Sequence, residues 1–318
     1  MKRWWNAWVE LLSVREPGTT LAALRIGVGL VLLYSVLSVM AAGLVEVMWV
    51  DAAYGGLQTL DTPHWLARVL GGRTPGTAWT LGWASLALGT MLVLGYGGRV
   101  TAFATLQVYS ATVDTKYTLT GGYDAMICNA LWLLVLAEST ATLSLDCRRR
   151  TGAWIGDREV AAWPRYLFIF QLVVVYGTTG LHKLSPVWTP GGSHSALYWV
   201  FQDPTWRRWD MDWTASIYGL TQIATAVAWW WEVLAPLLLW VYWLRHTAER
   251  GGRLRAFVHK YDPRILFVAI GITLHVSILV SVNVGPFSWI SMTYYLSMIP
   301  PDRWPPWLRR SPPRAPAS

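Results

Sequence analysis

The chain has 318 residues, of which 54% are hydrophobic and only 14% are charged, and its formal net charge is +8. Soluble domains carry about 25% charged residues, so this composition excludes an ordinary water-soluble protein and indicates one that crosses a membrane several times. The 23 tryptophans are typical of the aromatic belts at membrane surfaces. The basic excess has a topological explanation, given below, so we expect no nucleic-acid partner, and no residue spacing indicates a metal site.

Residues 1–16 are predicted to form an amphipathic helix that lies on the cytoplasmic membrane surface. One face of this helix carries Trp4, Trp5, Trp8, Leu11 and Leu12. Pro17 and Gly18 end it, and residues 17–300 form the predicted transmembrane domain. The basic, proline-rich tail, residues 301–318, is expected to be disordered or interfacial on the cytoplasmic side.

Apolar runs predict an all-α integral membrane protein, a bundle of about eight transmembrane helices. The expected spans are residues 19–42, 77–96, 100–118, 124–144, 165–184, 214–244, 265–284 and 286–300. As a straight helix the run 214–244 would be about 46 Å long. We therefore expect it to start outside the membrane or to tilt strongly.

Lysine and arginine concentrate in the predicted loops on the side of both termini, for example at 148–150 and 245–264. Basic loops favour the cytoplasm, so we expect a multi-pass protein of a plasma membrane of the bacterial inner-membrane type, with both termini cytoplasmic. The outer segments 43–76 and 185–213 are too long for simple turns. The second is expected to form an extracytoplasmic cap or an ordinary amphipathic loop.

Five ionisable residues fall inside the predicted spans, where a charge costs about 3 kcal/mol. They are Arg25, Glu138, Lys183, Glu232 and His275. At 1.5 Å per residue, Arg25 and Glu138 lie roughly 12 Å from the inner face, and we expect them to form a structural ion pair, with Glu232 as an alternative partner. The same count places Glu232 and His275 roughly 16–18 Å, and Lys183 roughly 26 Å, from that face.

Lys183 ends the apolar run 166–184 and has two interpretations. Its long stem allows the amine to reach the headgroups, or the amine acts as a general base on a lipid-soluble acid such as a quinol. His182 projects about 100° around the helix from Lys183, so the two are not expected to form a dyad. His275 suits proton transfer, although a histidine on an apolar helix face is often a satisfied core residue.

Five stretches in order along the chain resemble motifs of the HTTM family, integral membrane proteins related to vitamin K-dependent gamma-carboxylase. The stretches are Leu24–Gly29; Gly121–Asp124 with the distant Asp146; Gly180–Leu184 with Trp188 and Gly191-Gly192; Glu232 with Pro236; and His275 with Gly285–Ser288 and Met292. The resemblance implies that Lys183 is a base that deprotonates a reduced, vitamin K-like quinone. We expect His275 to be its proton partner, and we expect substrate to be bound by His182, Trp188, Tyr123, Asp124 and Glu232.

Two departures from the carboxylase argue against protein gamma-carboxylation. Tyr123 or Asp124 stands where the carboxylase has a histidine, and we expect no large extracytoplasmic region for a propeptide. The expected partners are membrane lipids, a quinone and a membrane-protein partner.

The sequence is compatible with three function classes. The first is a membrane enzyme acting on a quinone or another lipid-soluble substrate. The second is a non-catalytic binding or assembly factor whose polar residues hold helices together. The third is a transporter, for which a helix break at residues 177–180 would be the indication.

Overall fold

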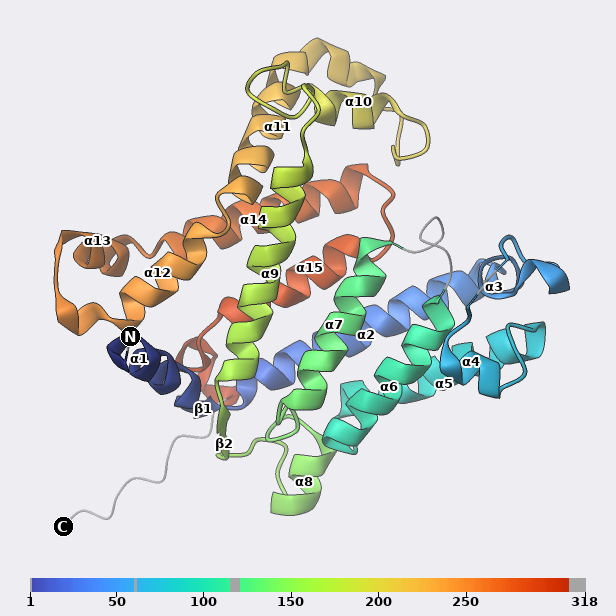
Figure 1. The fold of residues 1–318 in the computed structure, drawn as a ribbon, viewed down its shortest axis with the longest axis horizontal. Coiled ribbons are helices and arrows are strands. Elements are labelled where there is room, and N and C mark those ends of the chain that lie inside the picture. Colours follow the sequence, from blue (N-terminus) through green and yellow to red (C-terminus); the bar gives the residue numbers. More distant parts are fainter. Residues whose placement is uncertain (1, 60–61, 115–120, 309–318) are drawn as a thin grey trace. The chain divides into compact units, whose positions relative to one another are not determined.

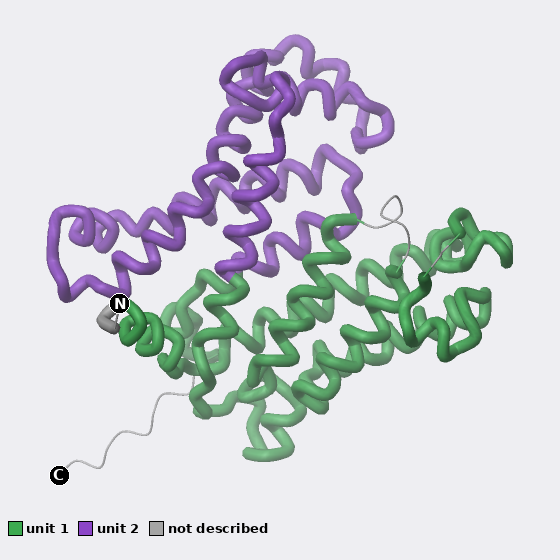
Figure 2. Tube along the Cα trace, in the orientation of Figure 1, with its two compact units in different colours: residues 1–168, 296–318 green, residues 169–295 purple. Residues whose placement is uncertain are grey.

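The computed structural model describes residues 2–59, 62–114 and 121–308. Over these residues the chain is mostly α-helical, as predicted, with one two-stranded sheet. It divides into two compact units, one of Met1–Phe168 with Leu296–Ser318 and one of Ile169–Tyr295 (Figure 2).

The first unit is built from long helices that follow one another in sequence and pack in that order. Its elements are α1 (Lys2–Ser13), β1 (Arg15–Pro17), α2 (Thr19–Ala41), α3 (Val45–Trp49), η1 (Ala52–Tyr54), α4 (Trp65–Val69), α5 (Pro75–Leu94), α6 (Gly98–Val113), α7 (Gly122–Leu136), α8 (Leu145–Thr151), β2 (Glu159–Ala161), η4 (Leu296–Met298), η5 (Pro301–Arg303) and η6 (Pro306–Leu308). Helix α2 packs on α5, α5 on α6, and α6 on α7 (Figure 1).

A buried ion pair joins distant parts of the first unit. Strands β1 and β2 pair antiparallel, with Glu16 opposite Val160. Both Glu16 carboxylate oxygens accept hydrogen bonds of 2.7 Å from Arg165, in the first turn of α9 (Trp163–His182). Arg165 also donates to the Ser297 carbonyl at 3.1 Å. One guanidinium therefore connects β1, α9 and η4.

The second unit begins within α9 and contains the elements that form the candidate site. These are α10 (Ala196–Gln202), η2 (Asp212–Ile217), α11 (Tyr218–Val233), α12 (Leu237–His246), η3 (Ala248–Arg250), α13 (Arg253–Tyr261), α14 (Pro263–Ser281) and α15 (Phe287–Tyr295). Helix α10 packs on α11, α14 packs on α15, and both α11 and α12 contact α14 (Figure 1).

Length and composition mark α2, α5 and α14 as helices able to cross a membrane, among the residues that the structure describes. A fourth candidate is the pair 212–233 and 237–246, which are bent by 54° at a short break. The predicted run 214–244 is therefore neither one straight helix nor one tilted helix. Pro236 lies in the break, and proline removes a backbone donor and disfavours a continuous helix. Residues 177–180, in contrast, stay helical within α9.

The two ends of the chain differ in how far the predictions hold. Helix α1 covers Lys2–Ser13 rather than the whole predicted range, because Arg15–Pro17 forms strand β1. It exposes much of Trp4 and Trp5 (62% and 70%), which suits an interfacial helix. The predicted tail is not wholly irregular, because residues 301–308 contain η5 and η6 and the Trp304 indole donates to Thr20 Oγ1 at 2.8 Å. Residues 309–318 lie outside the described part of the chain.

Candidate functional site

Lys183 and Glu232 form a bidentate ion pair in the second unit. Lys183 directly follows α9, and Glu232 lies in the last turn of α11. The Lys183 Nζ is 2.7 Å from Oε1 and 2.6 Å from Oε2 of Glu232. The side chains are 21% and 8% exposed, respectively. Both residues were predicted site residues, but their pairing was not.

Two glycines of α9 let this helix approach the end of α11 closely. A Cβ on Gly180 would lie 2.8 Å from the Val233 amide nitrogen and 2.9 Å from the Glu232 Cβ. A Cβ on Gly177 would lie 3.0 Å from Pro236 Cγ. Small residues at such crossings allow backbones to approach in membrane helices. The glycines therefore place Lys183 within reach of Glu232.

Gly180→Ala should weaken the ion pair without removing either charge. The added methyl group would overlap backbone atoms of α11, so α9 has to move away from Glu232. Overpacking of this kind destabilises by about 1–3 kcal/mol. The matched control is Gly219→Ala in α11, where a Cβ meets no atom within 4 Å and where alanine should stabilise by about 0.5–1 kcal/mol. Thermal unfolding of both variants measures this contrast, and equal melting temperatures would contradict the close approach.

The ion pair lies on the wall of a cavity of about 530 Å³ whose lining is otherwise mostly apolar. The lining residues are Lys183, Trp188, Leu197, Val200, Phe201, Ala224, Thr225, Val227, Ala228, Glu232, Ala269, Ile270, Thr273, Leu274, Ser277, Ile278, Ser281, Val282, Val284 and Phe287. The Lys183 Nζ lies 4.3 Å from the centroid of the Trp188 ring, within cation–π range. Such a pocket combines one charged pair with surfaces for an apolar ligand.

The segment between α9 and α11 covers one side of this cavity. The Leu197 amide of α10 donates to Thr225 Oγ1 of α11 at 3.1 Å, so α10 is fixed above the pocket. Leu197, Val200 and Phe201 line the cavity at helical spacing. These three residues were not predicted from the sequence, although their i, i+3, i+4 pattern in the predicted cap was a visible signal.

His275 lies apart from Lys183, contrary to its predicted role as proton partner. Its Nε2 is 2.7 Å from the hydroxyl of Tyr176, which is 2.8 Å from the hydroxyl of Tyr295. Tyr176 precedes Lys183 by seven residues, about 10 Å along α9. Thr273 and Ser277 line the cavity, and a residue between them on a helix points to the other side. His275 therefore hydrogen-bonds within a buried group with Tyr176 and Tyr295, although its ring also contacts Phe287 of the cavity wall, with ring centroids 5.5 Å apart.

The other predicted substrate-binding residues have local contacts. His182 is exposed, and its Nδ1 is 2.7 Å from the Thr178 carbonyl oxygen, one helical turn back. Tyr123 and Asp124 belong to α7 of the first unit. There Asp124 accepts hydrogen bonds from the Tyr109 hydroxyl at 2.7 Å and from the Gly121 amide at 3.0 Å. Of the predicted set, the cavity brings together Lys183, Trp188 and Glu232.

The predicted pair of Arg25 and Glu138 is replaced by other contacts. Arg25 donates to the carbonyl oxygens of Ser139 and Leu143, at 3.2 and 2.6 Å. Glu138 instead pairs with Arg158 at 3.1 Å and Arg99 at 3.7 Å. Helix α7 ends at Leu136 rather than continuing to residue 144. Glu138 is therefore not on a helix face opposite Arg25, and loop carbonyls satisfy the buried guanidinium.

A family model for the HTTM domain matches residues 15–202, more than half of the chain. The matched region includes Arg25 and its loop partners, all of α9, and the cavity residues Lys183 and Trp188. It ends before α11, which supplies Glu232, and before α14, which supplies the opposite wall of the cavity. No curated protein and no solved structure matches the chain. The chain belongs to the HTTM domain family, and it is a membrane protein.

Proposed function

We propose that this protein is a membrane enzyme that binds a reduced quinone, or another lipid-soluble acid, in the Lys183 cavity. The observation that carries the proposal is the bidentate Lys183–Glu232 pair on the wall of an otherwise largely apolar cavity. Ionisable groups are expensive in such surroundings and are typically functional. The apolar walls and the Trp188 ring suit a flat aromatic ligand.

Lys183 can act as a base only when its amine is neutral. Glu232 holds both carboxylate oxygens within 2.7 Å of Nζ and is the nearest proton acceptor. Transfer of one proton from Lys183 to Glu232 leaves a neutral amine beside the ligand. Lys183 then accepts the proton of the ligand hydroxyl, so the net transfer is from that hydroxyl to the Glu232 carboxylate.

Anaerobic titration with menadiol, a reduced naphthoquinone, tests this role. We expect the protein to bind menadiol and to shift its absorption to longer wavelength, because the deprotonated hydroxyl absorbs there. Lys183→Met should abolish the shift. His182→Gln changes the adjacent, exposed residue and should leave it intact. A shift that survives Lys183→Met would refute the base assignment, and absence of menadiol binding to the unaltered protein would refute a reduced quinone as the ligand.

A non-catalytic binding or assembly factor is the second candidate. It is favoured by the position of the pair, which joins α9 to α11 where Gly177 and Gly180 bring them into contact. In that case the ion pair would hold two helices together and need not exchange a proton. The menadiol titration separates the two, because a pair that only holds helices together produces no absorption shift in the unaltered protein.

We further propose that the chain crosses the membrane eight times with both termini cytoplasmic, the crossings being α2, α5, α6, α7, α9, the bent pair of α11 and α12, α14 and α15. Support comes from the apolar sequences of these helices and from the basic loops 148–150 and 245–264, which fall on one side in this topology. Helix α1 and the tail would then share the cytoplasmic surface. The test is Arg149→Cys, treated in whole cells with a membrane-impermeant thiol reagent. If the cysteine at this position were labelled, the proposed orientation would be wrong.

A further inference from the structure

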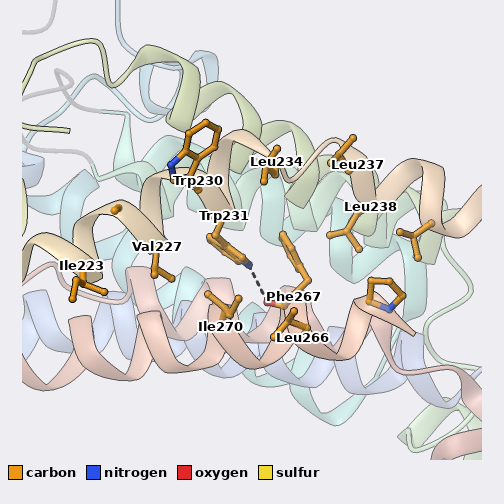
Figure 3. A pocket seen from close by; sticks show the side chains of 13 residues that line it. Ile223, Val227, Trp230, Trp231, Leu234, Leu237, Leu238, Leu266, Phe267 and Ile270 are labelled. Atoms are coloured by element: carbon orange, nitrogen blue, oxygen red, sulfur yellow. Dashed lines mark hydrogen bonds between the residues drawn. The ribbon is translucent and has the colours of Figure 1, made fainter. Parts of the chain in front are cut away.

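A second cavity of about 600 Å³ lies between α11, α12 and α14 and has no ionisable side chain in its lining (Figure 3). It is lined by Ile223, Ala226, Val227, Trp230, Trp231, Leu234, Leu237, Leu238, Val241, Pro263, Leu266, Phe267 and Ile270. The Trp231 indole is already satisfied by the Phe267 carbonyl at 3.0 Å, and its ring stacks on Phe267. The cavity therefore presents mainly hydrocarbon to an occupant.

This cavity is open and follows from the break between α11 and α12. The two helices are bent by 54°, and residues on both sides of the break line the cavity. Several lining side chains are more than half exposed, for example Leu237 at 55% and Leu266 at 64%. It shares Val227 and Ile270 with the Lys183 cavity but contains neither member of the ion pair.

Helix α13 connects α12 to α14 and is basic and amphipathic. Leu254, Phe257 and Tyr261 are each more than half exposed and lie at helical spacing. Its charged side chains are Arg253, Arg255 and Lys260, with no carboxylate within the helix. Basic helices with an exposed apolar face lie at anionic membrane surfaces.

Among the described residues no carboxylate pairs with Arg253, Arg255 or Lys260 of α13, although Arg255 donates to Thr247 Oγ1 and Lys260 lies over the Tyr261 ring. The carboxylate of Asp262, which directly follows α13, is bound by Arg264 at 2.7 Å and Arg245 at 3.6 Å. Arg245 also donates to the Val258 carbonyl, which fixes α13 to α12. Pro263, one residue beyond Asp262, already lines the cavity. Helix α13 therefore packs on α12, part of which lines the cavity, within one unit (Figure 1).

We propose that α13 and this cavity together bind one anionic phospholipid. An acyl chain occupies the cavity, and the phosphate of the headgroup contacts Arg253 and Lys260. Charge complementarity selects an anionic lipid over a zwitterionic one, because each lysine or arginine near the surface favours anionic headgroups. The open side of the cavity allows the acyl chain of the lipid to enter directly from the bilayer.

Native mass spectrometry of the delipidated full-length protein, titrated separately with palmitoyl-oleoyl phosphatidylglycerol and phosphatidylcholine, tests the proposal. We expect one phosphatidylglycerol to bind in preference. Arg253→Gln/Lys260→Gln should weaken that binding by about 10- to 30-fold. Ala226→Phe, which adds a ring on the cavity wall, should also weaken it.

The matched control is Arg148→Gln/Arg149→Gln, which removes two positive charges from α8. Both arginines are exposed, and each lies over an aromatic ring, at 5.3 and 5.5 Å. This variant should bind phosphatidylglycerol as the unaltered protein does. Equal binding of the two lipids, an equal loss in the control, or unchanged binding in Ala226→Phe would overturn the proposal.

Discussion

Lys183→Met should destabilise the protein by about 3 kcal/mol, because it leaves the Glu232 carboxylate buried without its cation. The Glu232 side chain is 8% exposed, so water compensates little. Glu232→Gln should cost less, since the Lys183 side chain is 21% exposed and its amine also faces the Trp188 ring. The measurement is the free energy of unfolding in mixed micelles.

The double variant Lys183→Met/Glu232→Leu tests whether the loss in Lys183→Met comes from the unpaired Glu232 carboxylate. Replacing both members of a buried pair by apolar side chains is often neutral or stabilising, so we expect stability to return to within about 1 kcal/mol of the unaltered protein. The absorption shift of bound menadiol should not return, because no base is present. If stability and the shift both returned, the enzyme reading would be wrong. A Lys183→Met protein of unchanged stability would contradict the buried pair itself.

The sequence predicts the long apolar helices well because their residues are apolar over the full length of a crossing. The predicted spans 19–42 and 265–284 correspond to α2 and α14. The run 214–244 was identified as too long, but its break at residues 234–236 depends on Pro236 and on packing against Gly177. Helix propensity alone does not set such a break.

The same break explains why Lys183 and Glu232 were predicted as separate residues. Depths counted at 1.5 Å per residue assume straight helices parallel to one axis. That count placed the two residues roughly 8–10 Å apart in height, whereas the structure places their charged atoms 2.6 Å apart. A 54° bend removes the common axis on which the count depends. Both residues could be chosen from sequence as ionisable groups in apolar runs, but their contact could not.

The end of α7 was mispredicted for a different reason. Residues 137–144 were included in the predicted span, yet beside Glu138 they contain four hydroxyl residues, Ser139, Thr140, Thr142 and Ser144. Ser144 caps α8 by accepting from the Cys147 amide at 2.9 Å. Two carbonyls of the loop bind Arg25, so a buried arginine stabilises irregular backbone where a helix was predicted. Serine and threonine often favour caps over helix interiors, and that signal was present.

Glu16→Ala should destabilise the protein by about 3–5 kcal/mol, the largest effect that we expect. The Arg165 and Glu16 side chains are only 6% and 9% exposed, and two hydrogen bonds of 2.7 Å join them. Removing the carboxylate takes two hydrogen bonds from the buried Arg165 guanidinium, which keeps its hydrogen bond to the Ser297 carbonyl. The matched control in the same unit is Glu138→Ala, whose side chain is 34% exposed and whose partners Arg99 and Arg158 are more than half exposed. Exposed pairs contribute about 0–1 kcal/mol.

Arg165→Lys tests whether charge or geometry stabilises this pair. Lysine keeps the positive charge but cannot present two parallel donors to the Glu16 carboxylate while a third reaches Ser297. We expect a loss of about 1–3 kcal/mol, between Glu138→Ala and Glu16→Ala, since each buried hydrogen-bonding group left unsatisfied costs in that range. Chemical unfolding of the three variants in one detergent gives the comparison. If Arg165→Lys unfolded like the unaltered protein, charge alone would stabilise the pair, and the planar guanidinium fork would not be what joins β1, α9 and η4.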